Sequence, residues 1–227
     1  MSHPQLPLAL RTPPDQRLAA FHGQPAVRDA LAAAARGERK DWLYLSGPAG
    51  SGKSHLLLAA CAEAGAHGRR AAYLPLAAFA GRLADALAAQ EGVHLACLDG
   101  LEAIAGHALD EEALFHFHNR SLASGATVVY AAGAAPAALG LGLPDLVTRL
   151  GQCTRITLAG LDDDGRRAVL RQRAARRGLQ LDEPVLDYLM RRADRDLASL
   201  TALLDRLDKA SLAAQRRITI PFLRDYL

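Results

Sequence analysis

Short apolar runs alternate with longer alanine- and leucine-rich segments over the first 160 residues. The apolar runs are residues 42–45, 71–74, 93–99, 127–132 and 154–158. Apart from the shorter run at 154–158, they are almost entirely apolar instead of alternating with polar positions, which is typical of strands that are covered on both faces. The segments around them have the length and composition of helices and are residues 27–35, 55–64, 79–89 and 110–122. The pattern predicts an α/β fold in which helices cover both faces of a parallel sheet.

The pattern changes on both sides of this α/β region. Residues 1–15 contain four prolines and no helical period, so we expect a flexible tail. After Gly160 the signals are helical only, with an acidic helix start at 162–164 and leucines at helical spacing from 197 to 207. We therefore predict three parts, which are a tail at 1–15, an α/β domain at 16–160 and a small all-helical subdomain at 161–227.

Residues 47–54 read Gly-Pro-Ala-Gly-Ser-Gly-Lys-Ser and fit G-x-x-x-x-G-K-[ST], the phosphate-binding loop. Glycines let successive backbone N–H groups turn inward around an anion, and the lysine reaches the β- and γ-phosphates. A strand before the loop and a helix after it favour this interpretation over an ordinary glycine-rich turn. The sequence predicts a nucleotide site formed by Gly47, Gly50, Ser51, Gly52, Lys53, Ser54 and His55.

The predicted strand at 93–99 ends in a carboxylate, Asp99, which together with the Ser54 hydroxyl is a candidate ligand for Mg²⁺. Rapidly hydrolysing relatives of such sites carry a second acidic residue next, but here the position is Gly100. Glu102 follows two residues later and is a weaker candidate for that role, and residues 131–133 lack a polar side chain. We expect a domain that holds nucleotide well and hydrolyses it poorly.

Composition and residue spacing bear on three further questions: whether the chain binds nucleic acid, holds a metal, or meets a membrane. The net charge of +3 permits contact with nucleic acid but does not by itself indicate it. The arginines between 166 and 177 are compatible with a solvated helix surface, a nucleic-acid patch or a lid. The three cysteines are isolated, and His116 and His118 are two positions apart, so neither set has metal-ligand spacing. No secretory pattern is present, and glycines and prolines break the apolar stretch 126–144, so we expect a cytoplasmic protein without membrane contact.

Taken together, several stretches make the chain resemble the AAA+ module of the bacterial replication initiator DnaA, and most of all its short regulatory homologues, the Hda family. The stretches are residues 47–54, 97–106, 142–150, 194–197, 207–211 and 218–222. The resemblance implies an AAA+ core with a helical lid. It also implies that Arg149 is an arginine finger acting on the γ-phosphate of a neighbouring protein, and that Arg195 contacts nucleotide from the lid. The sliding-clamp peptide of the family is matched by Gln5, Leu6, Leu8 and Leu10.

The function implied by this resemblance is regulation of replication initiation. The chain would hold ADP or ATP with Mg²⁺, bind the β sliding clamp of DNA polymerase III, and stimulate hydrolysis of ATP bound to DnaA, which inactivates the initiator. DNA would be contacted only through the clamp, and homo-oligomer formation stays open. Three alternatives remain: an ATPase of the DnaA or helicase-loader type, a small-molecule kinase, and an adaptor between the clamp and another protein. Because the sequence ends at Leu227, we expect no helix-turn-helix domain for reading an origin.

Overall fold

The computed structural model describes residues 17–21, 23–192 and 197–226, without the side chains of 197 and 198. The predicted clamp peptide and Arg195 lie outside these residues. Within them, no helix is long and apolar enough to cross a membrane.

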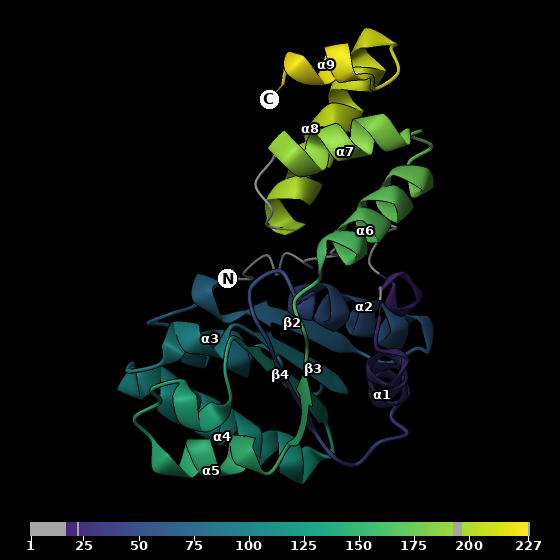
Figure 1. The fold of residues 1–227 in the computed structure, drawn as a ribbon. Helices are drawn as coiled ribbons and strands as arrows, with labels where there is room; N and C mark the ends of the chain where they lie inside the picture. Colours follow the sequence, from purple (N-terminus) through teal and green to yellow (C-terminus); the bar gives the residue numbers. More distant parts are fainter. Residues whose placement is uncertain (1–16, 22, 193–196, 227) are drawn as a thin grey trace, which may run out of the picture.

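Five parallel strands form the central sheet (Figure 1). They are β1 (Leu43–Ser46), β2 (Ala71–Pro75), β3 (Leu95–Asp99), β4 (Thr127–Ala132) and β5 (Thr154–Thr157). Their order is β2-β3-β4-β1-β5, and all four pairings are parallel. The first and third strands in the chain are thus separated by β4, and their carboxyl ends meet at one edge of the sheet, where ligands of such folds bind.

Helices cover both faces, as the apolar strands predict (Figure 1). On one face α1 (Pro25–Arg36) and α2 (Lys53–Ala66) pack on strand residues such as Leu45 and Val129. On the other face α3 (Leu83–Ala88), α4 (Ala108–Ser124) and α5 (Pro144–Gly151) pack on residues such as Tyr44 and Tyr130. Four short 3-10 helices complete this core: η1 (Leu18–Ala20), η2 (Leu76–Ala78), η3 (Leu101–Ile104) and η4 (Pro136–Ala138). The predicted parallel sheet with helices on both faces is confirmed.

The predicted helix at 79–89 is wrong in its first part, because α3 begins only at Leu83. Gly81 has a φ of +81°, which turns the chain before the helix. The Asp110 carboxylate, only 2% exposed, then accepts hydrogen bonds from the N–H groups of Gly81 at 2.5 Å and Leu83 at 3.0 Å. A side chain on α4 therefore caps α3, which local sequence does not reveal. The helix α5 was also absent from the sequence-based assignment.

The C-terminal residues form a separate helical lid, which stands beyond the core in Figure 1. Its helices are α6 (Asp163–Arg176), α7 (Glu183–Arg192), α8 (Leu197–Ala214) and α9 (Ile220–Arg224). The Asp162 carboxylate caps α6 by accepting from the Gly165 N–H at 2.7 Å. Apolar side chains such as Leu186, Leu204 and Leu207 fill the space between these helices.

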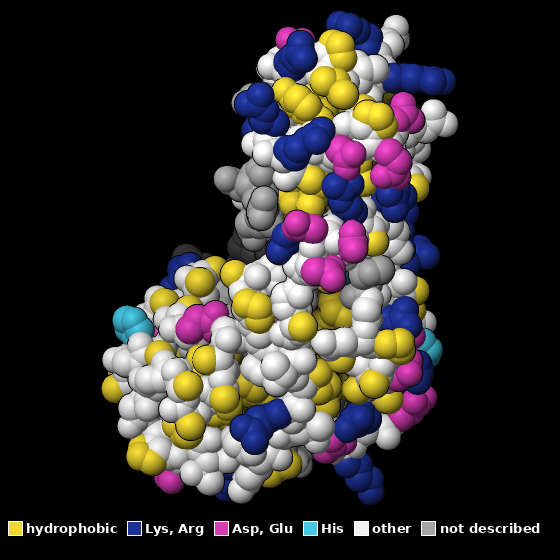
Figure 2. Space-filling model, viewed as in Figure 1, with side chains coloured by type: hydrophobic (Ala, Val, Ile, Leu, Met, Phe, Trp, Pro, Cys, Tyr) yellow, Lys and Arg dark blue, Asp and Glu magenta, His cyan; other side chains and the backbone are white. Residues whose placement is uncertain are grey.

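Arginines of the lid are paired with acidic side chains of neighbouring helices. Arg167 pairs with Asp187 of α7, and Arg177 pairs with Asp205 of α8 at 2.5 Å. Two further pairs are Arg166–Asp163 and Arg171–Glu183. Figure 2 shows Lys and Arg side chains interspersed with Asp and Glu on this face of the lid. These pairings favour a solvated, ion-paired helix surface over a uniform basic patch or the free arginines of a kinase lid.

Candidate nucleotide-binding site

The phosphate-binding sequence forms the turn between β1 and α2. Gly50 and Gly52 have φ values of +74° and +92°, a left-handed conformation that side chains disfavour. A Cβ atom on Gly52 would also lie 2.7 Å from the Phe21 ring, so a larger residue would have to displace that ring. The loop leads directly into the N-terminus of α2 at Lys53, where the helix dipole favours an anion. The loop therefore has the backbone geometry of a phosphate site.

Lys53 lies across the mouth of this loop. Its Nζ donates to the carbonyl oxygens of Gly47 at 2.6 Å and Pro48 at 2.8 Å. Burial lowers the pKa of this ammonium group, whereas the negative charges of Glu102 and Asp99 raise it. The ammonium group is thus bound to carbonyl oxygens of the loop and lies within the electrostatic influence of two carboxylates. A phosphate in the loop would meet it there.

Tyr73 joins the two candidate magnesium ligands, which the sequence did not indicate. Its hydroxyl donates to Asp99 Oδ2 at 2.7 Å. Burial and this bond raise the pKa of Tyr73, and the Ser54 hydroxyl opposes the rise, so all three groups lie together. The position follows from register, because Tyr73 on β2 lies opposite Cys97, two residues before Asp99.

One carboxylate and one hydroxyl fit the preference of Mg²⁺ for a few protein oxygens, with phosphates and water as the other ligands. Asp99 and Ser54 could therefore hold the ion, and Mg²⁺ would there neutralise phosphate charge. No group of three or more histidine, cysteine or acidic side chains suited to a metal occurs among the described residues. The protein part of the candidate metal site is consequently small.

The segment before α1 packs on the same loop. The Phe21 ring stacks on His55, with 6.4 Å between ring centroids and an interplanar angle of 23°. His55 is on the first turn of α2, so Phe21 covers the start of this helix, which begins at Lys53. This contact places the end of η1, and the chain that precedes it, beside the candidate nucleotide site.

Arg149 lies apart from the residues of the candidate nucleotide site. It lies in the last turn of α5, whose Leu146 and Leu150 pack on the face of the sheet opposite to α2. Its side chain is half-buried and forms no hydrogen bond or ion pair with the residues that the structure describes. Its charge acts on His118 of α4, whose pKa falls to about 4 because of burial first and Arg149 second.

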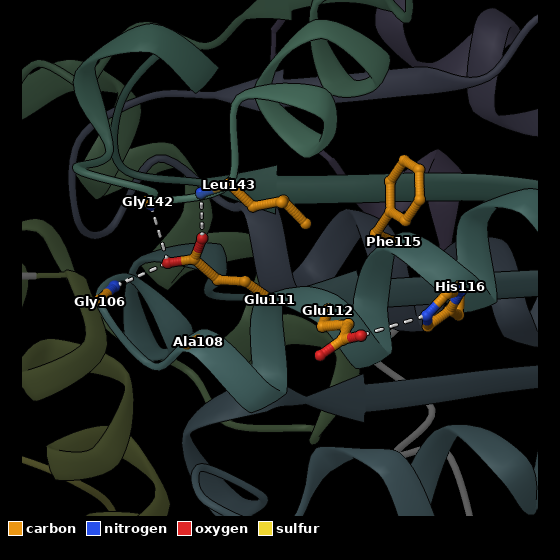
Figure 3. A pocket seen from close by; sticks show the side chains of 8 residues that line it. All are labelled: Gly106, Ala108, Glu111, Glu112, Phe115, His116, Gly142 and Leu143. Carbon is orange, nitrogen blue, oxygen red and sulfur yellow. Dashed lines mark hydrogen bonds and ion pairs between the residues drawn. The ribbon is translucent and has the colours of Figure 1, made fainter.

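A buried carboxylate fixes the start of the helix that carries Arg149 (Figure 3). Glu111 of α4, 1% exposed, accepts from the N–H groups of Gly142 at 3.0 Å and Leu143 at 2.7 Å. It also accepts from Gly106 at 2.8 Å. Leu143 is the residue immediately before α5, so this carboxylate ties α5 to α4 beside a cavity of about 420 Å³. From sequence, Glu111 looked like one more acid in a first helical turn.

Comparisons with known proteins agree with this arrangement. Residues 163–227 match the family model for the lid domain of Hda. The chain is similar to domain III of the replication initiation protein DnaA from Thermotoga maritima, with a TM-score of 0.78 and 22% identity, covering 94% of this chain and 97% of that one.

Two further solved structures share the architecture. AMPPCP-bound DnaA from Aquifex aeolicus has a TM-score of 0.70 and 22% identity, over 86% of this chain and 65% of that one. The Holliday junction branch migration motor RuvB from Thermotoga maritima has a TM-score of 0.65 and 18% identity, over 92% and 70%. The chain thus combines a C-terminal segment that matches the Hda lid model with the fold of DnaA domain III.

Proposed function

We propose that this chain is a nucleotide-binding regulator of replication initiation that stimulates hydrolysis of DnaA-bound ATP. In this proposal ADP or ATP with Mg²⁺ occupies the loop before α2, and Arg149 acts on the ATP of the partner. The observation that carries it is that the phosphate loop and Arg149 lie on different faces of the sheet. The phosphate loop is complete, while Arg149 lies on a helix on the opposite face of the sheet, without a partner for its charge among the described residues.

The nucleotide serves the chain's own structure in this proposal. A solved DnaA with a related fold binds AMPPCP, and the loop geometry around Lys53 suits the same type of ligand. Arg195 of the lid would contact the nucleotide, and Ser54 with Asp99 would hold Mg²⁺. Nucleotide between core and lid would then fix the angle at which the chain presents its surface to a partner.

Arg149 meets the physical requirements for action on a second protein. It is half-buried, and its side chain forms no hydrogen bond or ion pair with the residues that the structure describes. The helix that carries it is anchored at its start by Glu111 and buries Leu146 and Leu150. A guanidinium placed on a transferring phosphoryl group contributes roughly 10³–10⁵ in rate. A rigid support matters because this contribution depends on position.

Residues 1–15 provide the tether in this proposal. Gln5, Leu6, Leu8 and Leu10 would dock on the β sliding clamp, which concentrates the chain near DnaA on DNA in the cytoplasm. Such a tether raises effective concentration without adding contacts at the active site. The clamp is therefore expected to lower the concentration of this chain at which hydrolysis of DnaA-bound ATP is half-maximal, and to change the maximal rate less.

The test measures hydrolysis of ATP bound to DnaA, with clamp-loaded DNA and increasing amounts of this chain. We expect Arg149→Ala to bring the rate down towards that of DnaA alone. Arg155→Ala is the matched control, because Arg155 is an exposed arginine on β5. Changing Gln5 and Leu6 to alanine should raise the concentration required. If folded Arg149→Ala stimulates hydrolysis as well as the parent, Arg149 is not an arginine finger. If the variant of Gln5 and Leu6 is as active as the parent with clamp-loaded DNA, these residues are not the tether.

A further inference from the structure

The Glu102 side chain lies at the end of β4, where the sequence lacks a polar group for hydrolysis. After Asp99 the chain turns at Gly100, which has a φ of +80° and donates from its N–H to the Ala131 carbonyl at 2.9 Å. This turn starts η3 and directs Glu102 to the end of β4. There its Oε2 accepts a hydrogen bond from the Gly133 N–H at 3.2 Å.

The charge of Glu102 acts on the phosphate-binding lysine. Glu102 is the first and Asp99 the second of the negative charges that raise the pKa of Lys53. Asp99 is already engaged by the Tyr73 hydroxyl. Glu102 is exposed, and among the described residues its carboxylate accepts a hydrogen bond from the Gly133 N–H alone. Gly133 follows the end of β4, which lies beside the phosphate loop, because the Gly47 N–H donates to the Ala132 carbonyl at 3.3 Å.

A carboxylate at position 100 itself would not achieve this placement. Gly100 is in the left-handed region, so a side chain there is strained, although nothing lies within 4 Å of the place its Cβ would take. The turn that disfavours a side chain at position 100 is the same turn that brings Glu102 to the end of β4. The backbone turn at Gly100 thus accounts for a carboxylate at position 102 instead of position 100.

We propose that Glu102 is the catalytic base of a slow ATP hydrolysis that this chain performs by itself. The proposal rests on nucleotide binding at Lys53, as put forward above. Glu102 takes a proton from a water molecule whose oxygen bonds to the γ-phosphorus. The bond from that phosphorus to the β,γ-bridging oxygen breaks, which gives ADP and phosphate, and the proton passes to solvent. One hydrogen bond from Gly133 orients the carboxylate only in part, so turnover is slow.

Glu102→Gln separates catalysis from binding. The amide oxygen can still accept from Gly133, but the side chain can no longer take a proton. The protein is loaded with one equivalent of ATP and Mg²⁺, and the bound nucleotide is identified over time by chromatography. Binding of AMPPCP and of ADP is measured separately by calorimetry. Glu91→Gln is the control, because Glu91 is an exposed acid in the turn after α3, away from the loop.

We expect the parent and Glu91→Gln to convert bound ATP to ADP, and Glu102→Gln to retain ATP with a rate at least ~100-fold lower. The Kd for AMPPCP should change less than about threefold, since binding does not require the proton transfer. Equal conversion by Glu102→Gln, or ATP that binds to the parent without ever being hydrolysed, overturns the proposal and leaves the nucleotide site intact. Failure of the parent to bind either nucleotide overturns both proposals.

Discussion

Replacing Glu111 by glutamine should destabilise the protein far more than the same change at its neighbour Glu112. The Glu111 carboxylate is buried and accepts three backbone hydrogen bonds, from Gly106, Gly142 and Leu143, at 2.7–3.0 Å. Glutamine offers one carbonyl oxygen, which can keep the two bonds to Oε1. Its amide group would then face the Leu143 N–H, which is itself a donor.

The magnitude follows from the burial of these donors. A hydrogen bond to a charged group contributes about 1.5–3 kcal/mol, and a buried donor left without a partner costs about 1–3 kcal/mol. Gly106 and Gly142 are exposed, so water can satisfy their N–H groups in part, whereas Leu143 is half-buried. We therefore expect a loss of about 2–4 kcal/mol for Glu111→Gln. This is a large part of the roughly 5–15 kcal/mol that typically stabilises a domain.

The assay is urea unfolding at pH 7, followed by circular dichroism, of the parent and both glutamine variants. Glu112 is exposed and pairs with His116 at 3.6 Å, so Glu112→Gln should stay within about 0.5 kcal/mol of the parent. A Glu111→Gln variant as stable as Glu112→Gln would refute the view that this carboxylate holds α5 in place. A second measurement, stimulation of DnaA, should also fall in Glu111→Gln, because Arg149 loses its fixed support.

Two further predictions concern pH and magnesium. Because the pKa of His118 is about 4 in the folded protein and near 6.5 when unfolded, the unfolded chain binds the proton first as pH falls. The free energy of unfolding should therefore drop by up to about 3 kcal/mol from pH 7 to pH 4, and His118→Gln should flatten this slope in urea titrations; parallel slopes would contradict it. Tyr73→Phe removes the donor to Asp99, so the gain in nucleotide affinity on adding Mg²⁺ should shrink about tenfold, with little change in affinity without Mg²⁺. An unchanged magnesium dependence in calorimetry would show that Tyr73 has no such role.

The features that the sequence predicts well are those whose cause is local. The buried strands are continuous apolar runs, and the loop around Lys53 has a spacing that its backbone geometry demands. The contacts that were missed join residues far apart in the chain. Tyr73 meets Asp99 through the pairing of β2 with β3, and Glu111 meets Leu143 across 32 positions. No residue pattern within one segment could indicate either contact.

For two features, α5 and the position of the Glu102 carboxylate, the sequence gives a local signal but an incomplete one. The helix α5 has only eight residues, so its apolar pattern is limited to a few positions such as Leu146 and Leu150, which pack in the same core as α4. Glu102 was visible as an acid near the right place, but only the backbone turn at Gly100 shows where its carboxylate goes. The roles of Arg149, Arg195 and the clamp peptide stay predictions, since they depend on partners or on residues outside the described part of the chain.

The packing of Phe21 on Gly52 and His55 sets a limit on how far the chain can extend from its nucleotide. Phe21 lies eleven positions after Leu10, and a fully stretched chain covers at most about 3.6 Å per residue. A clamp that holds the peptide must therefore lie within roughly 40 Å of Phe21. Under the proposed function, a DnaA molecule would have to bind its ATP within reach of a chain tethered at this distance, so the spacing between clamp and DnaA along the DNA would affect the rate of hydrolysis.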